Sequence, residues 1–151
     1  MTPPVAIPPA RILVIDDEPQ IRRFLDIALR AEGYQVALAE GGRAGLEWLA
    51  LHGADLVVLD LGLPDLEGHE VLAELRAWST VPVIVLSVRA SESEKVRALD
   101  AGAHDYVTKP FGIHEWMARV RGLLRHRGSP REEPPVVSDG RLEIDRARRR
   151  V

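Results

Sequence analysis

Residues 56–60 read Leu56-Val57-Val58-Leu59-Asp60, four consecutive apolar residues followed by one carboxylate. A strand with one wet face alternates apolar and polar residues, whereas a strand covered on both faces reads as a continuous Val/Ile/Leu run. We therefore predict a central parallel strand whose carboxyl end presents Asp60.

Three other runs end in a polar group in the same way. Ile12-Leu13-Val14-Ile15 is followed by Asp16-Asp17, Val83-Ile84-Val85-Leu86 by Ser87, and Tyr106-Val107-Thr108 by Lys109-Pro110. A further strand is predicted at about residues 35–39. Ligands of open α/β sheets bind at the carboxyl ends of the strands, so we expect all four polar ends to face one crevice.

Helical patterns separate these strands. The apolar residues Ile21, Phe24, Leu25, Ala28 and Leu29 have the spacing of one buried helix face, with Pro19 in the first turn and Gly33 as the stop. Further helices are predicted at about residues 42–51, 68–77, 91–101 and 112–127, and we expect Ala44, Leu46 and Trp48 on or near the inner face of the first. Five β-α units predict an α/β fold, a flavodoxin-like doubly wound parallel sheet of five strands in the order 2-1-3-4-5 with five helices.

The composition is that of one ordinary domain with a short extension. The 151 residues include 46% hydrophobic and 28% charged residues, with a net charge of -3. The absence of cysteine excludes disulfides, thiolate metal sites and a cysteine nucleophile. No apolar run approaches the roughly 18 residues of a membrane span, and the Pro-rich start has no signal-peptide pattern. We expect a cytoplasmic protein without a membrane partner.

Three carboxylates are predicted to meet in the crevice, namely Asp16, Asp17 and Asp60. They raise one another's pKa unless a cation lies among them, and oxygen ligands without His or Cys indicate Mg²⁺, with Mn²⁺ possible. A solvent-facing acidic loop is the alternative, which a lone Asp pair would favour and the third Asp disfavours. Asp60 is the candidate nucleophile for a phosphoryl group, with Lys109 as a second cation and Ser87 as a hydroxyl donor. The Lys109-Pro110 bond is a candidate cis peptide, although a trans loop proline is commoner.

These residues resemble the receiver domain of two-component response regulators over residues 11–126. The motifs that carry the resemblance are Ile15-Asp16-Asp17-Glu18, Leu59-Asp60-Leu61-Gly62-Leu63-Pro64, Leu86-Ser87 and Tyr106-Val107-Thr108-Lys109-Pro110-Phe111. The resemblance implies a CheY-like fold and phosphorylation of Asp60 by a sensor histidine kinase, with Mg²⁺ held by Asp16, Asp17, Asp60 and the Gly62 carbonyl. It implies no enzyme activity beyond the domain's own phosphorylation and autodephosphorylation. Ser87 and Tyr106 would be the switch pair, and Gly62 and Arg89 would flank the path of the hydrolytic water.

The resemblance extends to the winged-helix (OmpR/PhoB) class of regulators. It implies a homodimer through the fourth helix, fifth strand and fifth helix, with Lys95 paired to Glu115 and Asp105 to Arg119 across a two-fold axis. The implied contact residues are Lys95, Val96, Leu99, Asp105, Glu115, Met117 and Arg119. Pairs within one helix or solvated charges are the alternative. His104 departs from the class, which more often has Asp there and uses it in a charge contact of the dimer. Residues 78–79, 81–87 and 99–102 are especially similar to the potassium-uptake regulators of this class.

The expected domain organisation has four parts. Residues 1–10 form a disordered extension, 11–127 the receiver, 128–135 a Gly/Pro/Glu/Arg linker, and 136–151 the incomplete start of a winged-helix DNA-binding domain. DNA binding would need the full-length protein. A stand-alone receiver or phosphorelay module is the main alternative, and residues 128–151 argue against it. A haloacid-dehalogenase-type phosphatase is a second alternative, but its nucleophile follows the first strand with another Asp two residues on, whereas Asp16 and Asp17 are adjacent.

Overall fold

Strands and helices alternate without exception along residues 8–125, which are the residues that the computed structural model describes. The elements are β1 (Arg11–Ile15), α1 (Pro19–Ala31), β2 (Gln35–Ala39), α2 (Gly42–His52), β3 (Leu56–Leu59), α3 (Gly68–Arg76), β4 (Val83–Ser87), α4 (Glu92–Asp100), β5 (Asp105–Thr108) and α5 (Ile113–Leu124). All neighbouring strands pair in parallel, in the order β2-β1-β3-β4-β5. The predicted fold class, strand order and helix number are confirmed.

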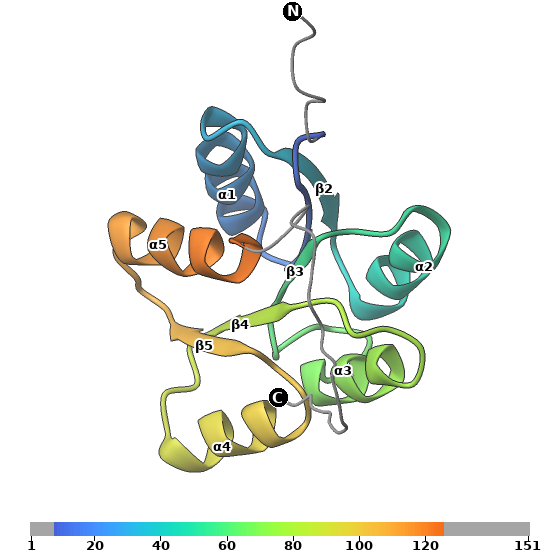
Figure 1. The fold of residues 1–151 in the computed structure, drawn as a ribbon. Helices are drawn as coiled ribbons and strands as arrows, with labels where there is room; N and C mark the ends of the chain where they lie inside the picture. The colour runs from blue at the N-terminus through green and yellow to red at the C-terminus, as the bar shows by residue number, and fades with distance from the viewer. Residues whose placement is uncertain (1–7, 126–151) are drawn as a thin grey trace, which may run out of the picture.

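The helices cover both faces of the sheet (Figure 1), with α1 and α5 on one face and α2, α3 and α4 on the other. Alternate residues of each strand enter different halves of the core. Ile12 and Val14 pack under α1 and α5, whereas Leu13 and Ile15 pack under α2 and α3. All four are at most 1% exposed. This two-sided burial explains why the central strands are apolar throughout except at their ends, where Arg11 begins β1 and Ser87 ends β4.

Two expected core positions are wrong. Phe24 is 44% exposed, although it has the spacing of the buried face of α1. Ala44 is also exposed, and the buried positions of α2 include two glycines, Gly42 and Gly45. A Cβ built on Gly45 would lie 2.5 Å from Cδ1 of Ile15, so the absence of a side chain lets α2 approach β1 closely. The inner face of α2 is therefore rotated toward its glycines.

The folded part of the chain begins slightly before the expected boundary at Arg11. Ala10 is 5% exposed, and its carbonyl accepts a hydrogen bond from the backbone N–H of Gln35 at 2.9 Å. Residues 1–7, the expected linker 128–135 and the expected winged-helix segment 136–151 lie outside the described residues. Within the described range, no helix is long and apolar enough to cross a membrane.

Candidate functional site

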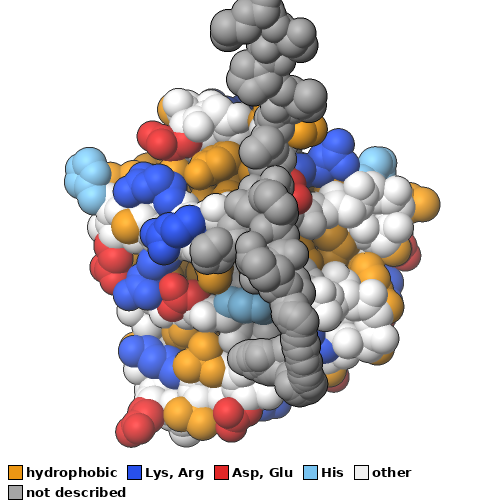
Figure 2. All heavy atoms as spheres, in the orientation of Figure 1, with side chains coloured by type: hydrophobic (Ala, Val, Ile, Leu, Met, Phe, Trp, Pro, Cys, Tyr) orange, Lys and Arg blue, Asp and Glu red, His pale blue; other side chains and the backbone are white. Residues whose placement is uncertain are grey.

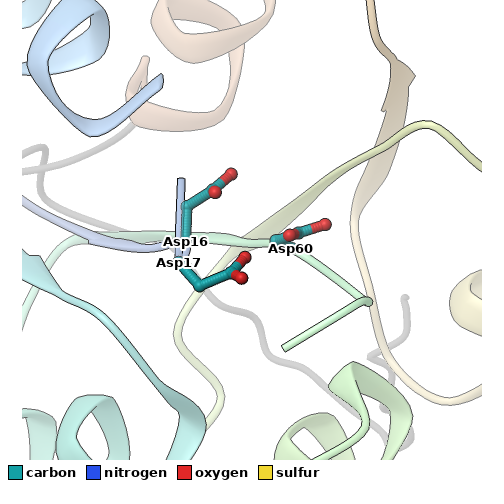
Figure 3. Close-up of side chains that lie close together, drawn as sticks. All are labelled: Asp16, Asp17 and Asp60. Carbon is teal, nitrogen blue, oxygen red and sulfur yellow. The ribbon is translucent and has the colours of Figure 1, made fainter. Parts of the chain in front are cut away.

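The carboxylates of Asp16, Asp17 and Asp60 meet at the carboxyl end of the sheet. Figure 3 shows them projecting from the adjacent ends of β1 and β3 toward one region. One carboxylate oxygen from each residue lies within 4.8 Å of the others. Asp16 and Asp60 are buried, at 1% and 7% exposure, whereas Asp17 is exposed. The predicted meeting of three acids is therefore confirmed.

Burial dominates the electrostatics of this cluster. Removal from water raises the pKa of Asp60, and the charge of Asp16 raises it further. The pKa of Asp16 is also raised by burial, against the opposing effects of the Glu18 backbone N–H and of Lys109. A divalent cation would relieve this repulsion, and an all-oxygen donor set suits Mg²⁺ or Mn²⁺. The residues present thus fit the expected ion.

Lys109 supplies the positive charge of the site. Its Nζ lies 3.1 Å from Oδ2 of Asp16 and 3.9 Å from Oδ2 of Asp60, and its side chain is 9% exposed. The same Nζ donates to Oε1 of Glu18 at 2.7 Å. Burial alone would lower the pKa of Lys109, but its carboxylate partners outweigh burial and raise it. The ammonium is therefore charged and shared among three acids. The Lys109-Pro110 peptide bond is cis, which was one of the two conformations considered from the sequence, the other being trans.

Ser87 and Tyr106 both form hydrogen bonds with the backbone of Arg89, in the segment that follows β4. Ser87 is 1% exposed, and its Oγ accepts a hydrogen bond from the backbone N–H of Arg89 at 3.1 Å. The ring of Tyr106 is buried, and its hydroxyl donates to the carbonyl of Arg89 at 2.6 Å. Burial raises the pKa of Tyr106, so this hydroxyl keeps its proton. Both expected switch residues are thus tied to the backbone of Arg89.

A cavity of about 240 Å³ opens among these groups. The residues that line it are Asp17, Glu18, Asp60, Gly62, Ser87, Val88, Arg89 and Lys109. The backbone N–H of Gly62 lies 3.4 Å from Oδ1 of Asp60. A tetrahedral group bonded to Asp60 would therefore be surrounded by a cation, a hydroxyl, a backbone N–H and acids able to hold a metal ion.

The expected dimer residues share one side of the molecule. Figure 2 shows charged side chains of both signs interspersed over α4, β5 and α5. On α4, Val96 and Leu99 are 47% and 45% exposed. Within the chain, Arg119 donates to Glu115 of the same helix at 2.8 Å, which is the alternative pairing, and also to Asp105 of β5 at 2.9 Å.

The remaining two dimer residues differ in exposure. Met117 is 6% exposed and packs in the core with Trp116, so it offers little surface to a partner, whereas Lys95 is half-buried.

Sequence reasoning assigned no role to two acids near the site. Glu18 contacts Lys109, and its position directly after Asp16-Asp17 was the available signal. Glu67 holds the guanidinium of Arg89 through two hydrogen bonds of 3.1 Å. These partners belong to different loops, 22 residues apart, and no motif in the sequence connects them.

Comparison with known proteins agrees with this geometry. Residues 12–121 match the response regulator receiver domain. The transcriptional regulatory protein KdpE of Mycobacterium tuberculosis is 52% identical over 141 residues, which cover 93% of this chain and 62% of that protein. KdpE of Escherichia coli is 49% identical over 138 residues, covering 91% of this chain and 61% of that protein. The expected likeness to one type of winged-helix regulator is thus confirmed as a likeness to KdpE over most of the chain.

A solved structure shows the same architecture. The receiver domain of the Francisella response regulator 1452 superposes with a TM-score of 0.74 at 33% identity, covering 78% of this chain and 98% of that one. The chain spans about three fifths of the length of the KdpE proteins that it matches. Because the match covers most of the chain and includes its fold, this protein belongs to the response regulator receiver family.

Proposed function

We propose that this chain is a phosphorylation switch in which Asp60 accepts a phosphoryl group from a sensor histidine kinase. The observation that carries the proposal is the placement of a buried, electron-rich carboxylate between Lys109 and two further acids, beside an open cavity. A phosphoryl acceptor needs an attacking oxygen and positive charge near the equatorial oxygens. The site offers both.

In the proposed phosphoryl transfer to Asp60, one bond to phosphorus forms and one breaks. An oxygen of Asp60 attacks phosphorus, the bond from phosphorus to the donor nitrogen breaks, and an acyl phosphate forms while the donor histidine regains a proton. Lys109 neutralises one phosphoryl oxygen, and Ser87 turns its hydroxyl toward another. Asp16, Asp17, Asp60 and the Gly62 carbonyl would hold Mg²⁺, which supplies further charge neutralisation when bound. Lys109 and the acids already lie together, so Ser87 is the one group of this set that has to turn.

The surface beside the cavity suits a protein donor. A largely apolar groove of about 390 Å³ adjoins Lys109 and Glu18. Its lining includes Val88, which is 71% exposed, and Phe24, which is 44% exposed. An exposed apolar patch next to a reactive group marks a contact site for another macromolecule. Packing in the core does not explain why Phe24 is exposed, whereas docking of the phosphoryl-donor protein in this groove would.

Downstream, the proposal follows the winged-helix class. Turning of Ser87 toward the phosphoryl group would shift the loop that holds Tyr106 and so alter the α4-β5-α5 face. The exposed Val96 and Leu99, with Asp105 and Arg119 beside them, would then form a homodimer interface. The relatives are named as transcriptional regulators, and this chain would act likewise through a DNA-binding domain in a longer protein.

The test compares the chain with its Asp60→Asn variant, using a small phosphodonor and Mg²⁺ and following mass and sedimentation together. The proposal expects one added phosphoryl group in the parent, none in Asp60→Asn, and conversion of monomer to dimer only in the parent. Incorporation without dimerisation would remove the proposed α4-β5-α5 interface. Absence of incorporation in the parent would refute phosphoryl acceptance itself.

A further inference from the structure

A second cation lies at the mouth of the cavity but is held away from the acids. The guanidinium of Arg89 makes hydrogen bonds of 3.1 Å to both carboxylate oxygens of Glu67, and its Nη1 lies 3.6 Å from Oε1 of Glu94. The Arg89 side chain also lines the cavity together with Asp60 and Lys109. A Cβ built on Gly62 would lie 4.0 Å from Nη2 of Arg89.

The charge balance of the cavity changes when Asp60 is phosphorylated. Among the described residues, Lys109 alone forms ion pairs with Asp16 and Asp60, and it shares its charge with Glu18 as well. An acyl phosphate replaces one carboxylate charge with about two phosphate charges. The planar guanidinium of Arg89 matches phosphoryl oxygens in the same two-pronged way in which it now matches Glu67.

We propose that Arg89 is a partner-exchanging positioning residue, whose guanidinium leaves Glu67 for the phosphoryl group when Asp60 is phosphorylated. This inference rests on the proposed function. The exchange leaves no buried charge without a partner. Glu67 is half exposed and returns to water, whereas Glu94 keeps its contact of 3.2 Å with Nε2 of His69.

The exchange reaches the switch residues through the backbone of Arg89. Its N–H donates to Ser87 and its carbonyl accepts from the hydroxyl of Tyr106. At present, the Glu67 pair fastens this segment to the start of α3, because Glu67 directly precedes that helix. Release of Glu67 therefore frees the β4–α4 loop at the moment when the phosphoryl group captures Arg89.

The experiment measures the affinity for beryllofluoride, a phosphoryl mimic, with Mg²⁺ by fluorine NMR in the parent chain, Glu67→Gln, Arg89→Gln and the double variant. If Glu67 competes with the phosphoryl group for Arg89, Glu67→Gln tightens binding about two- to fivefold, the range of partly exposed ion pairs. Arg89→Gln weakens it by a similar factor. In the Arg89→Gln background, Glu67→Gln then has no effect, because the competition is gone.

Glu70→Gln is the matched control. Glu70 lies in the same first turn of α3 and accepts a hydrogen bond from the backbone N–H of Glu67, which a glutamine oxygen also accepts. The Glu70→Gln variant removes the same charge, and among the described residues the ion pairs of Arg89 are with Glu67 and Glu94, so the affinity of this variant for beryllofluoride should equal that of the parent. A structural clamp would shift Glu67→Gln and Arg89→Gln in the same direction, and that result overturns the exchange.

Two further outcomes separate this inference from the proposed function. Unchanged affinity in Arg89→Gln, with normal binding by the parent, overturns the exchange alone. A parent chain that neither binds beryllofluoride nor incorporates phosphate overturns both.

Discussion

Gly68, the first residue of α3, controls both the stability of the fold and the position of Asp60. A Cβ at Gly68 would lie 2.5 Å from Cα of Leu61, 2.7 Å from its Cδ2 and 2.8 Å from the carbonyl oxygen of Asp60. Two of these three atoms are backbone, so rotation of a side chain cannot relieve the overlap. Gly68→Ala must therefore move α3 away from the end of β3 or move Asp60 itself.

The expected cost of Gly68→Ala follows from this geometry. Overpacking typically costs about 1 to 3 kcal/mol, and the first turn of a helix returns only a fraction of the roughly 1 kcal/mol that Ala gains over Gly. We expect unfolding free energy to fall by about 2 kcal/mol, measured by urea denaturation, with Tm lower by about 6 °C. We also expect phosphorylation by a small donor to slow about tenfold, because a displacement of about 1 Å can cost a hundredfold.

Two glycine variants serve as controls for Gly68→Ala. Gly122→Ala places a Cβ 3.8 Å from Nη2 of Arg125, which is ordinary contact, and should stabilise α5 by up to about 1 kcal/mol. Gly45→Ala overlaps only the side chain of Ile15, so it should lower stability without slowing phosphorylation. If Gly68→Ala matches the parent in stability and rate, the close approach of α3 to Asp60 does not exist and the reasoning fails.

Three other variants test separate parts of the molecule. His104 accepts from the backbone N–H of Val83 at 3.2 Å, and burial followed by the charge of Arg76 lowers its pKa below 6.5. The neutral His104 ring contributes fully to stability above pH 6.5, and this contribution is lost as the pH falls from 6.5 through the pKa of the folded state. In His104→Asn, the slope of the unfolding free energy against pH below pH 6.5 should therefore shrink. Asp65 accepts from two backbone N–H groups at the start of α2, both at 2.9 Å, so Asp65→Ala should lower unfolding free energy by about 1 to 2 kcal/mol; an unchanged urea midpoint would contradict this. Lys109→Gln should destabilise the metal-free chain by about 3 kcal/mol, because it leaves buried carboxylates without their cation, and the deficit should shrink as the pH falls through the raised pKa values of Asp16 and Asp60; a deficit that does not change with pH would contradict this.

The sequence predicted the strands well because burial on both faces leaves a plain signal. Every residue of β3 and β4 is buried, and unbroken apolar runs mark both. Parallel pairing then brings Asp16 next to Asp60 whatever the side-chain details. The acid cluster could therefore be predicted from the ends of the runs alone.

Other features carried no such signal. An apolar pattern does not show that Gly45 rather than Ala44 faces the core. Gly45 is buried because it has no side chain and so lets α2 approach Ile15 closely, and a hydrophobic pattern does not record that. Phe24 lies beside the groove next to Lys109, and that groove forms only once the β5–α5 loop, with Pro110 and Phe111, lies beside α1. The pair between Glu67 and Arg89 depends on rotamers and loop paths, which leave no periodicity in the sequence.

The distance along the chain between Asp16 and Lys109 affects when the protein becomes competent during its synthesis. These two residues are separated by 93 positions, yet their side chains lie 3.1 Å apart. A ribosome needs roughly 5 to 20 s to add that many residues at ordinary rates. Until β5 has left the ribosome and docked at the edge of the sheet, a nascent chain has its acceptor carboxylate but not its cation. Under the proposed function, a half-made copy would therefore be a poor phosphoryl acceptor, and only copies in which β5 has docked would compete for signalling donors.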